Sequence, residues 1–234
     1  MRRVITTLAV VATFFAATEY SSAQSIIWDQ QPDTTLTGVI NQDIPEPQSA
    51  FSTYLVNDAT FSSNVTIDSV TTFFTNSSGT WGSLITDGIL NIFDGDALVA
   101  SDDPTTGGDF GPGSVSLSVT DLGNNVLAVT ASGLSINLAA GTYFFGLSPS
   151  LPSDTDPQEF HYDSGTTVGL ASQARNPGGG FLPLLGTTDW LDANGLSPGF
   201  GDAAFTITSE PIPEPTTAGL LALGLVGLTA RRRR

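Results

Sequence analysis

Apolar and polar residues alternate along most of the chain with the two-residue period of β-strands. The clearest example is Ser114–Thr120, where Val and Leu occupy every second position between Ser and Thr. Gly123, Asn124 and Asn125 then predict a tight turn into a second strand over Val126–Thr130, which together indicate a hairpin. Further strands are predicted over Ala50–Val56, Val65–Thr75, Gly88–Phe93, Leu134–Leu138, Thr142–Leu147 and Ala203–Thr208.

Short strands separated by Gly, Pro, Asn and Asp are typical of an all-β protein, and none of these segments keeps the period of a helix. The segment from Leu151 to Phe200 is less regular. We expect long loops there, with one or two strands over Glu159–Tyr162 and Thr167–Ala171. The sequence therefore predicts a single antiparallel β-sandwich of jelly-roll type over residues 24–212, flanked by two targeting segments.

Residues 1–23 have the features of a secretory signal peptide. Two arginines precede an apolar run over Val4–Ala17, and small residues follow at Ser21 and Ala23. The run suits the secretion translocon but is short for a resident membrane span. We expect cleavage between Ala23 and Gln24, with an uncleaved anchor as the alternative.

The other end of the chain, residues 213–234, combines three features in order. Pro213, Glu214 and Pro215 are followed by an uncharged span over Thr216–Ala230. The chain then ends in four arginines, Arg231, Arg232, Arg233 and Arg234. A helix over the span would be about 22 Å long, and snorkelling arginines with local bilayer thinning can cover the shortfall from a core of about 30 Å. We expect a transmembrane helix whose arginines stay in the cytoplasm as a membrane stop; a helix packed into a soluble core is the alternative.

This tail resembles the PEP-CTERM sorting signal of Gram-negative bacteria. The resemblance assigns the motif to Pro213, Glu214 and Pro215, the membrane span to Thr216–Ala230 and the basic stop to the final arginines. It implies export, transient residence in the inner membrane, processing by an exosortase-type enzyme, and delivery of the body to the cell surface or extracellular matrix. A second Pro-Glu-Pro at Pro45–Pro47 has no apolar span after it, so we interpret it as a turn.

The charge distribution excludes several classes of function. Of 23 acidic residues, all but Glu19 lie between Gln24 and Pro215, where Arg175 is the only base. Direct binding to nucleic acid needs cations that this region lacks. The chain also has no Cys and no Lys, which excludes disulfides, thiolate metal sites and Schiff-base catalysis.

An acidic cluster, Asp94, Asp96, Asp102 and Asp103 with Asp109 behind it, is the candidate metal site. A Gly-interrupted Asp loop supplies the carboxylate and carbonyl oxygens that Ca²⁺ binds, although the spacing does not match an EF-hand. The alternative is an acidic turn between two strands. Calcium is the one cofactor that the sequence brings into consideration.

Aromatic residues and the single His provide the other candidates. Trp81, beside Ser77, Ser78 and Gly79, is the best candidate for a platform that stacks sugar rings, although tryptophans in sandwiches more often lie in the core. His161 fits a strand residue better than a general base, because no nucleophile motif accompanies it. No catalytic residue is identified.

We therefore expect an exported, non-enzymatic protein with a structural or adhesive role. A binding module for extracellular polysaccharide or calcium is the first alternative, and a secreted hydrolase with unidentified acids is the second. The expected partners are the secretion translocon, the exosortase-type enzyme and, before processing, the membrane.

Overall fold

The computed structural model describes residues 24–35, 37–76, 79–95, 97–152, 160–180 and 188–209, most of which belong to one compact unit, Ile26–Glu210. The predicted signal peptide (residues 1–23) and sorting segment (213–234) lie outside the described residues. No helix in the described ranges is long and apolar enough to cross a membrane.

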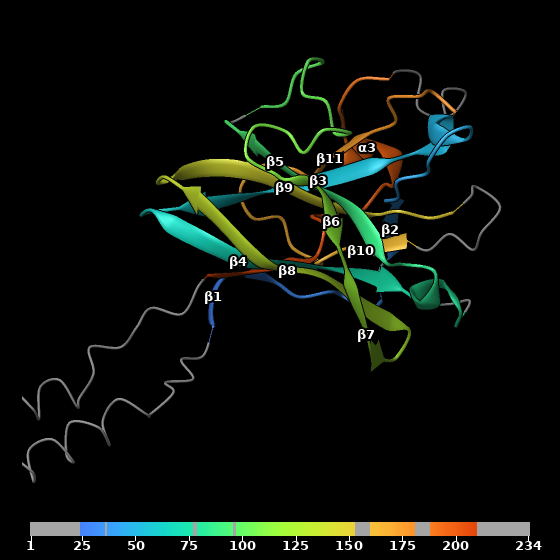
Figure 1. Ribbon diagram of the computed structural model, residues 1–234, viewed down its shortest axis with the longest axis horizontal. Coiled ribbons are helices and arrows are strands. Elements are labelled where there is room, and N and C mark those ends of the chain that lie inside the picture. Colours follow the sequence, from blue (N-terminus) through green and yellow to red (C-terminus); the bar gives the residue numbers. More distant parts are fainter. Residues whose placement is uncertain are drawn as a thin grey trace, which may run out of the picture. The chain divides into compact units, whose positions relative to one another are not determined.

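The body consists of two antiparallel sheets, which confirms the prediction of an all-β protein (Figure 1). The first, named here the β4 sheet, contains β1 (Ser25–Gln30), β2 (Thr37–Ile40), β4 (Val65–Thr75), β7 (Ser118–Gly123), β8 (Val126–Leu138), β10 (Phe160–Tyr162) and β13 (Phe205–Ser209). The second, the β9 sheet, contains β3 (Tyr54–Phe61), β5 (Asp87–Asp94), β6 (Gly113–Ser116), β9 (Gly141–Pro149), β11 (Gln173–Arg175) and β12 (Leu191–Asp192). Helical structure is limited to η1 (Ser49–Phe51), η2 (Trp81–Ser83) and α3 (Ala193–Leu196) in these residues.

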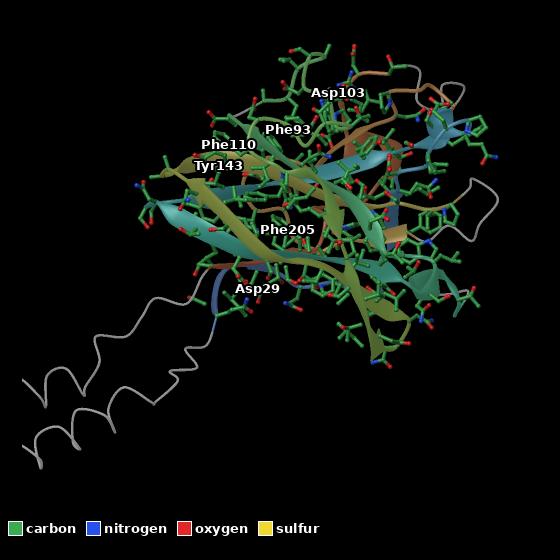
Figure 2. All side chains as sticks on the ribbon, in the orientation of Figure 1. Asp29, Phe93, Asp103, Phe110, Tyr143 and Phe205 are labelled. Carbon is green, nitrogen blue, oxygen red and sulfur yellow. The ribbon has the colours of Figure 1, made fainter. Side chains whose placement is uncertain are left out.

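Side chains from both sheets meet in one central core. Ile67 and Val70 of β4 and Phe205 of β13 face Leu90 and Ile92 of β5 across the gap, and all five are buried. Figure 2 shows Phe205 between the two layers. Burial of such side chains contributes about 1.5 to 3 kcal/mol each, so this core is the main source of stability.

The predicted hairpin is present, but its first strand is divided. Asn124 and Asn125 both have positive φ, as a tight two-residue turn requires, and they join β7 to β8. Upstream, β6 pairs with β5 in the β9 sheet, whereas β7 pairs with β8 in the β4 sheet. The alternating segment Ser114–Thr120 therefore passes from one sheet to the other near Leu117, whose N–H donates to the carbonyl of Thr86.

The two strands predicted over Val126–Thr130 and Leu134–Leu138 form the single strand β8. It pairs with β4 along the whole length of β4, and an irregularity lies where Ile67 pairs with Ile136 and Ser69 with Ser132. Gly133, with φ of +70°, lies in this irregular stretch. Its freedom at positive φ allows β8 to continue past a position that sequence reasoning took for a break.

A second apolar cluster covers the outer face of the β9 sheet. Phe144 faces outward between two core neighbours, and it packs with Tyr54, Val56, Phe93 and Trp190. Trp190 comes from the segment that precedes β12. Both faces of the central strand β9 are therefore covered, which explains the unbroken aromatic run at residues 143–145.

The segment predicted as a strand over Thr167–Ala171 is a loop, so that prediction is wrong. The N–H groups of Val168 and Leu170 donate to the carboxylates of Asp202 and Asp58 instead of to a neighbouring strand. These carboxylates take the place of the backbone carbonyls that would accept from the N–H groups of a strand. The turn predicted at Pro45–Pro47 is present.

Candidate functional site

Trp81 is not available as a sugar platform in this structure. It starts the short helix η2, is fully buried, and lies 4.9 Å from the ring of Phe74 between centroids. Ile85, Leu127, Val129 and Leu151 complete the cluster. The large apolar area of an indole ring favours burial at the end of the sandwich. The expectation of an exposed aromatic surface at this position is therefore corrected.

His161 lies on β10 and is also buried. Its ring packs edge-on against Phe74 at 4.9 Å between centroids, and its Nδ1 lies 3.0 Å from the carbonyl oxygen of Tyr162. Burial lowers the pKa of His161 to about 4, and the contact with that carbonyl opposes the shift only in part. The imidazole is therefore neutral at pH 7 and serves as a packing residue of the strand.

The acidic loop, defined as residues 94–112, uses its carboxylates to fix its own backbone. Asp109 accepts from the N–H of Asp94, Asp102 from that of Val99, and Asp103 from that of Thr105. In the described part of the chain, which excludes Asp96, no three acidic or His side chains are grouped so that they hold a metal ion. The Asp103 contact, with the N–H two residues further on, has the form of an Asx turn, whereas the Asp109 contact joins two distant parts of the loop. Calcium binding stays a prediction from the sequence.

Arg175 holds the acidic loop to the β9 sheet. Its guanidinium donates to three backbone carbonyls, those of Thr188 (2.9 Å), Asp102 (2.6 Å) and Ala100 (3.0 Å). Its carbon Cζ lies 5.9 Å from the ring centroid of Trp190, whose Nε1 also donates to the carbonyl of Asp102. The single base between Gln24 and Pro215 therefore joins β11, the Trp190 segment and the acidic loop. Figure 2 shows Asp103 in this loop, beyond the β9 sheet.

Three buried aspartates, Asp58, Asp163 and Asp202, fix the loop that follows β10. Asp202 accepts from the N–H groups of Val168 (2.6 Å) and Ser172 (3.3 Å). We call these three side chains the carboxylate anchors. The remaining contacts are Leu170 N–H to Asp58, Gly165 and Gly201 N–H to Asp163, and Gln30 Nε2 to Asp202.

Sequence reasoning missed the carboxylate anchors, although one signal was present. Asp58 lies with Asn57 in the middle of a buried strand after Leu55 and Val56, and Asp202 directly precedes Ala203 within a buried segment. Acidic residues are seldom fully buried unless their oxygens are paired. An acid inside a strand pattern therefore predicts a structural acceptor.

Burial leaves two of the anchors with a raised pKa. Desolvation is the main cause for Asp58, whose pKa rises to about 6; the neighbouring charge of Asp202 adds to the rise, and the N–H of Leu170 opposes it. Desolvation also raises the pKa of Asp202, against the three donors that it accepts. Ionisation of Asp58 is therefore opposed both by its burial and by the neighbouring Asp202.

We expect the free energy of unfolding to fall as pH rises from about 4 to about 6, because the folded state holds the proton of Asp58 more tightly than the unfolded state. The shift corresponds to a loss of about 1 to 2 kcal/mol after allowance for solvent screening. Urea denaturation of the wild type and Asp58→Asn at pH 4, 6 and 8 measures it. The Asn variant keeps an acceptor for Leu170 and should be the more stable protein at pH 6 and pH 8 but not at pH 4. The same difference in the free energy of unfolding between Asp58→Asn and the wild type at all three pH values would contradict a raised pKa of Asp58. Asp121→Asn, at an exposed carboxylate, is the control.

Comparison with known proteins identifies the tail. Residues 211–234 match the family model of the PEP-CTERM protein-sorting motif. The match contains all three features predicted from the sequence: the Pro-Glu-Pro residues, the uncharged span and the four arginines. No curated protein and no solved structure matches the chain. The chain therefore ends in a PEP-CTERM sorting motif, which supports an exported protein that an exosortase-type enzyme sorts.

Proposed function

We propose that this protein is a non-enzymatic component of the cell surface or extracellular matrix, with a structural or adhesive role. The observation that carries the proposal is the order of the chain: an all-β body ends with β13 at Ser209, and the sorting motif starts at residue 211. Only one residue separates them, so the tail acts on this body directly. We accordingly divide the chain into a signal peptide (residues 1–23), a β-sandwich body (24–212) and a sorting segment (213–234).

The arrangement of ionisable groups supports a structural role. His161 is buried and neutral, and the carboxylate anchors are occupied by backbone N–H groups. A general acid or base has to reach a substrate proton at hydrogen-bond distance. These side chains instead contribute to the stability of loops in a body that works outside the cell.

The connections between strands support the predicted jelly-roll type. The chain passes from β3 in one sheet to β4 in the other, returns to β5, and later passes from β8 to β9. Because β3 pairs with β9 and β4 pairs with β8, these two crossings lie side by side. Repeated crossing between two antiparallel sheets is a property of jelly rolls.

Deletion of residues 213–234 tests the sorting step. We expect the full-length protein on the cell surface or in the matrix, and the shortened protein in the periplasm or the medium, because the shortened chain keeps its signal peptide and loses its sorting substrate. Fractionation with an antibody raised against the folded body measures the distribution. Identical distributions would refute sorting through the tail.

The structural or adhesive role needs a separate measurement. A strain without the protein should lose surface adhesion or matrix cohesion, and a strain that expresses the shortened protein should show the same loss. A strain whose loss is restored by the shortened protein would contradict a role at the surface.

A further inference from the structure

We propose that the folded body forms an intramolecular ester between the hydroxyl of Thr206 and the side-chain carboxamide of Gln31, with Asp29 as the general base. The ester joins the first strand to the last, since Gln31 directly follows β1 and Thr206 lies in β13. The chain has no Cys, so a disulfide cannot make this connection. The inference assigns a covalent modification to three residues and goes beyond the proposed role at the surface.

The three polar side chains meet on one face of the β4 sheet. The hydroxyl of Thr206 donates to Oδ1 of Asp29 at 2.9 Å. Nε2 of Gln31 donates to the same carboxylate oxygen and also lies 3.4 Å from the hydroxyl oxygen of Thr206. One carboxylate oxygen therefore contacts both the proton of a nucleophile and the nitrogen of a leaving group. The carbon that would be attacked, Cδ of Gln31, is bonded directly to that nitrogen.

The two strands turn the hydroxyl and the carboxylate to the same side. Trp28 of β1 packs against Phe205 of β13 at 6.2 Å between ring centroids, on the core side of the sheet. The next residue in each strand, Asp29 or Thr206, therefore faces away from the core. Figure 2 shows Asp29 on the side of the β4 sheet that faces away from the β9 sheet. Core packing on one face thus fixes the nucleophile and its base on the other.

The backbone on both sides of Gln31 is also held in place. The preceding residue, Gln30, is buried. Two residues further on, the N–H of Asp33 donates to the carbonyl of Asp163 at 2.8 Å. The carboxamide is therefore kept beside Thr206, which raises the effective concentration of the hydroxyl. The side chain of Gln31 is exposed, so ammonia can depart into the solvent.

The reaction is an acyl transfer that releases ammonia. Asp29 removes the hydroxyl proton of Thr206 as Oγ1 attacks Cδ of Gln31, and a C–O bond forms. The bond from Cδ to Nε2 then breaks, its electron pair goes to the nitrogen, and the proton held by Asp29 passes to the same atom. The products are an ester, ammonia and the original carboxylate, so no oxidant, reductant or further reactant is needed. A carboxylate in contact with both groups can act first as the base and then as the acid.

A second pair of a hydroxyl and a carboxamide serves as an internal control. Thr66 of β4 donates at 2.8 Å to Oδ1 of Asn137, its partner on β8. The hydroxyl proton of Thr66 thus goes to the amide oxygen and not to a carboxylate, and the contact does not involve the leaving nitrogen. We expect no ester at this pair.

The ester closes the edge of the body where the chain leaves it. β1 is the last strand in the order of the β4 sheet, with β13 as its neighbour. β13 ends at Ser209 and the sorting motif starts at residue 211, so a pull on the C-terminal end acts first on β13. A bond between Gln31 and Thr206 keeps the two strands together under such a pull. It also lowers the conformational entropy of the unfolded chain, as a disulfide does.

Peptide mapping of the protein isolated from its host tests the inference. We expect a peptide pair in which the Gln31 and Thr206 segments are joined, with a mass lower than their sum by one ammonia molecule. Hydroxylamine, which cleaves esters, should separate the pair. Loss of ammonia at another Asn or Gln would leave the two peptides separate. Digestion with pepsin is suitable, because the ester is stable at low pH.

Three variants assign the roles. Thr206→Val removes the nucleophile and Asp29→Asn removes the base, and both keep the size of the side chain. Each should give separate peptides and a melting temperature lower than that of the wild type by about 5 to 10 °C. Thr66→Val, the control, should keep the joined pair. Thr206→Ser restores a hydroxyl and should restore the pair.

Two results would overturn the inference, and the first needs no variant. Separate and unmodified Gln31 and Thr206 peptides from the wild-type protein, both freshly isolated and after storage at neutral pH, would show that the ester does not form. A joined pair that forms in Asp29→Asn as completely as in the wild type would refute the role of Asp29 as the base.

Discussion

Replacing Asp202 with Ala is expected to lower the free energy of unfolding by about 3 to 5 kcal/mol, the largest effect of any carboxylate in the body. The side chain is fully buried and accepts from Val168 N–H, Ser172 N–H and the Nε2 of Gln30. Alanine would leave these donors without an acceptor beneath the loop. Urea or thermal denaturation of the exported protein measures the change.

Two variants separate this effect from a general effect of charge. Asp202→Asn keeps one acceptor oxygen and should lose clearly less stability than the Ala variant. Asp103→Ala removes an exposed carboxylate that accepts from the N–H and hydroxyl of Thr105, and should cost at most about 1 kcal/mol. Equal losses in the free energy of unfolding for Asp202→Ala and Asp103→Ala would show that burial of Asp202 does not add to its contribution to stability.

Replacing Arg175 with Ala is expected to cost about 2 to 4 kcal/mol, because three charge-assisted bonds and a contact with Trp190 are lost together. The acidic loop should also open, since the carbonyls of Ala100 and Asp102 are released from the β9 sheet. Denaturation measures the energy, and hydrogen exchange at residues 94–112 measures the opening.

The matched variant is Arg175→Lys, which keeps the positive charge. Lysine is a single donor group on a flexible stem and cannot reach three carbonyls in the directions that a planar guanidinium reaches. We expect it to recover less than half of the lost stability and to leave the loop open. A lysine variant as stable as the wild type would show that charge alone holds the loop.

The parts of the fold that follow from local pattern were predictable. The hairpin between β7 and β8 rests on Asn124 and Asn125, which tolerate positive φ, and on alternation in both strands. The long central strand β4 over Val65–Thr75 has the bounds predicted from its sequence. Period and turn chemistry are local properties, so a single sequence shows them directly.

Long-range features were not predictable from the same pattern. The alternation of Ser114–Thr120 contains no sign that Leu117 separates two sheets, because the choice of partner strand depends on distant residues. The burial of Trp81 depends in the same way on Phe74 and Leu127. The segment 167–171 has the composition of a strand. Its backbone N–H groups, however, donate to the carboxylates of Asp58 and Asp202 and not to a neighbouring strand.

The candidate site divides in the same manner. The sorting motif is a linear signal, so it was predicted from the sequence, and the family model matches the same segment at residues 211–234. The Asp residues of the acidic loop and Trp81 were chosen for their chemistry, and their role depends on geometry. In the structure the described carboxylates of that loop bind backbone N–H groups, and Trp81 belongs to the core.

The acidic character of the body has a consistent explanation in this account. The one base between Gln24 and Pro215, Arg175, donates to backbone carbonyls of the acidic loop. The sequence has no Lys, so acidic groups dominate the charge of the body. Like charge keeps exported copies apart until salt screens it. The arginines at the C-terminus belong to the sorting segment, and we expect processing to remove them from this charge balance.

The central claim is that the C-terminal motif directs sorting. The most direct test compares the glutamates of the two Pro-Glu-Pro tripeptides in the chain. Glu214 belongs to the sorting motif, whereas Glu46 belongs to the folded turn at Pro45–Pro47, where it accepts from the hydroxyl of Ser49. The measurement is the fraction of processed protein at the cell surface for Glu214→Ala and Glu46→Ala. The account predicts a strong loss for the first variant and a wild-type value for the second. Wild-type processing and location of the Glu214→Ala protein would contradict it.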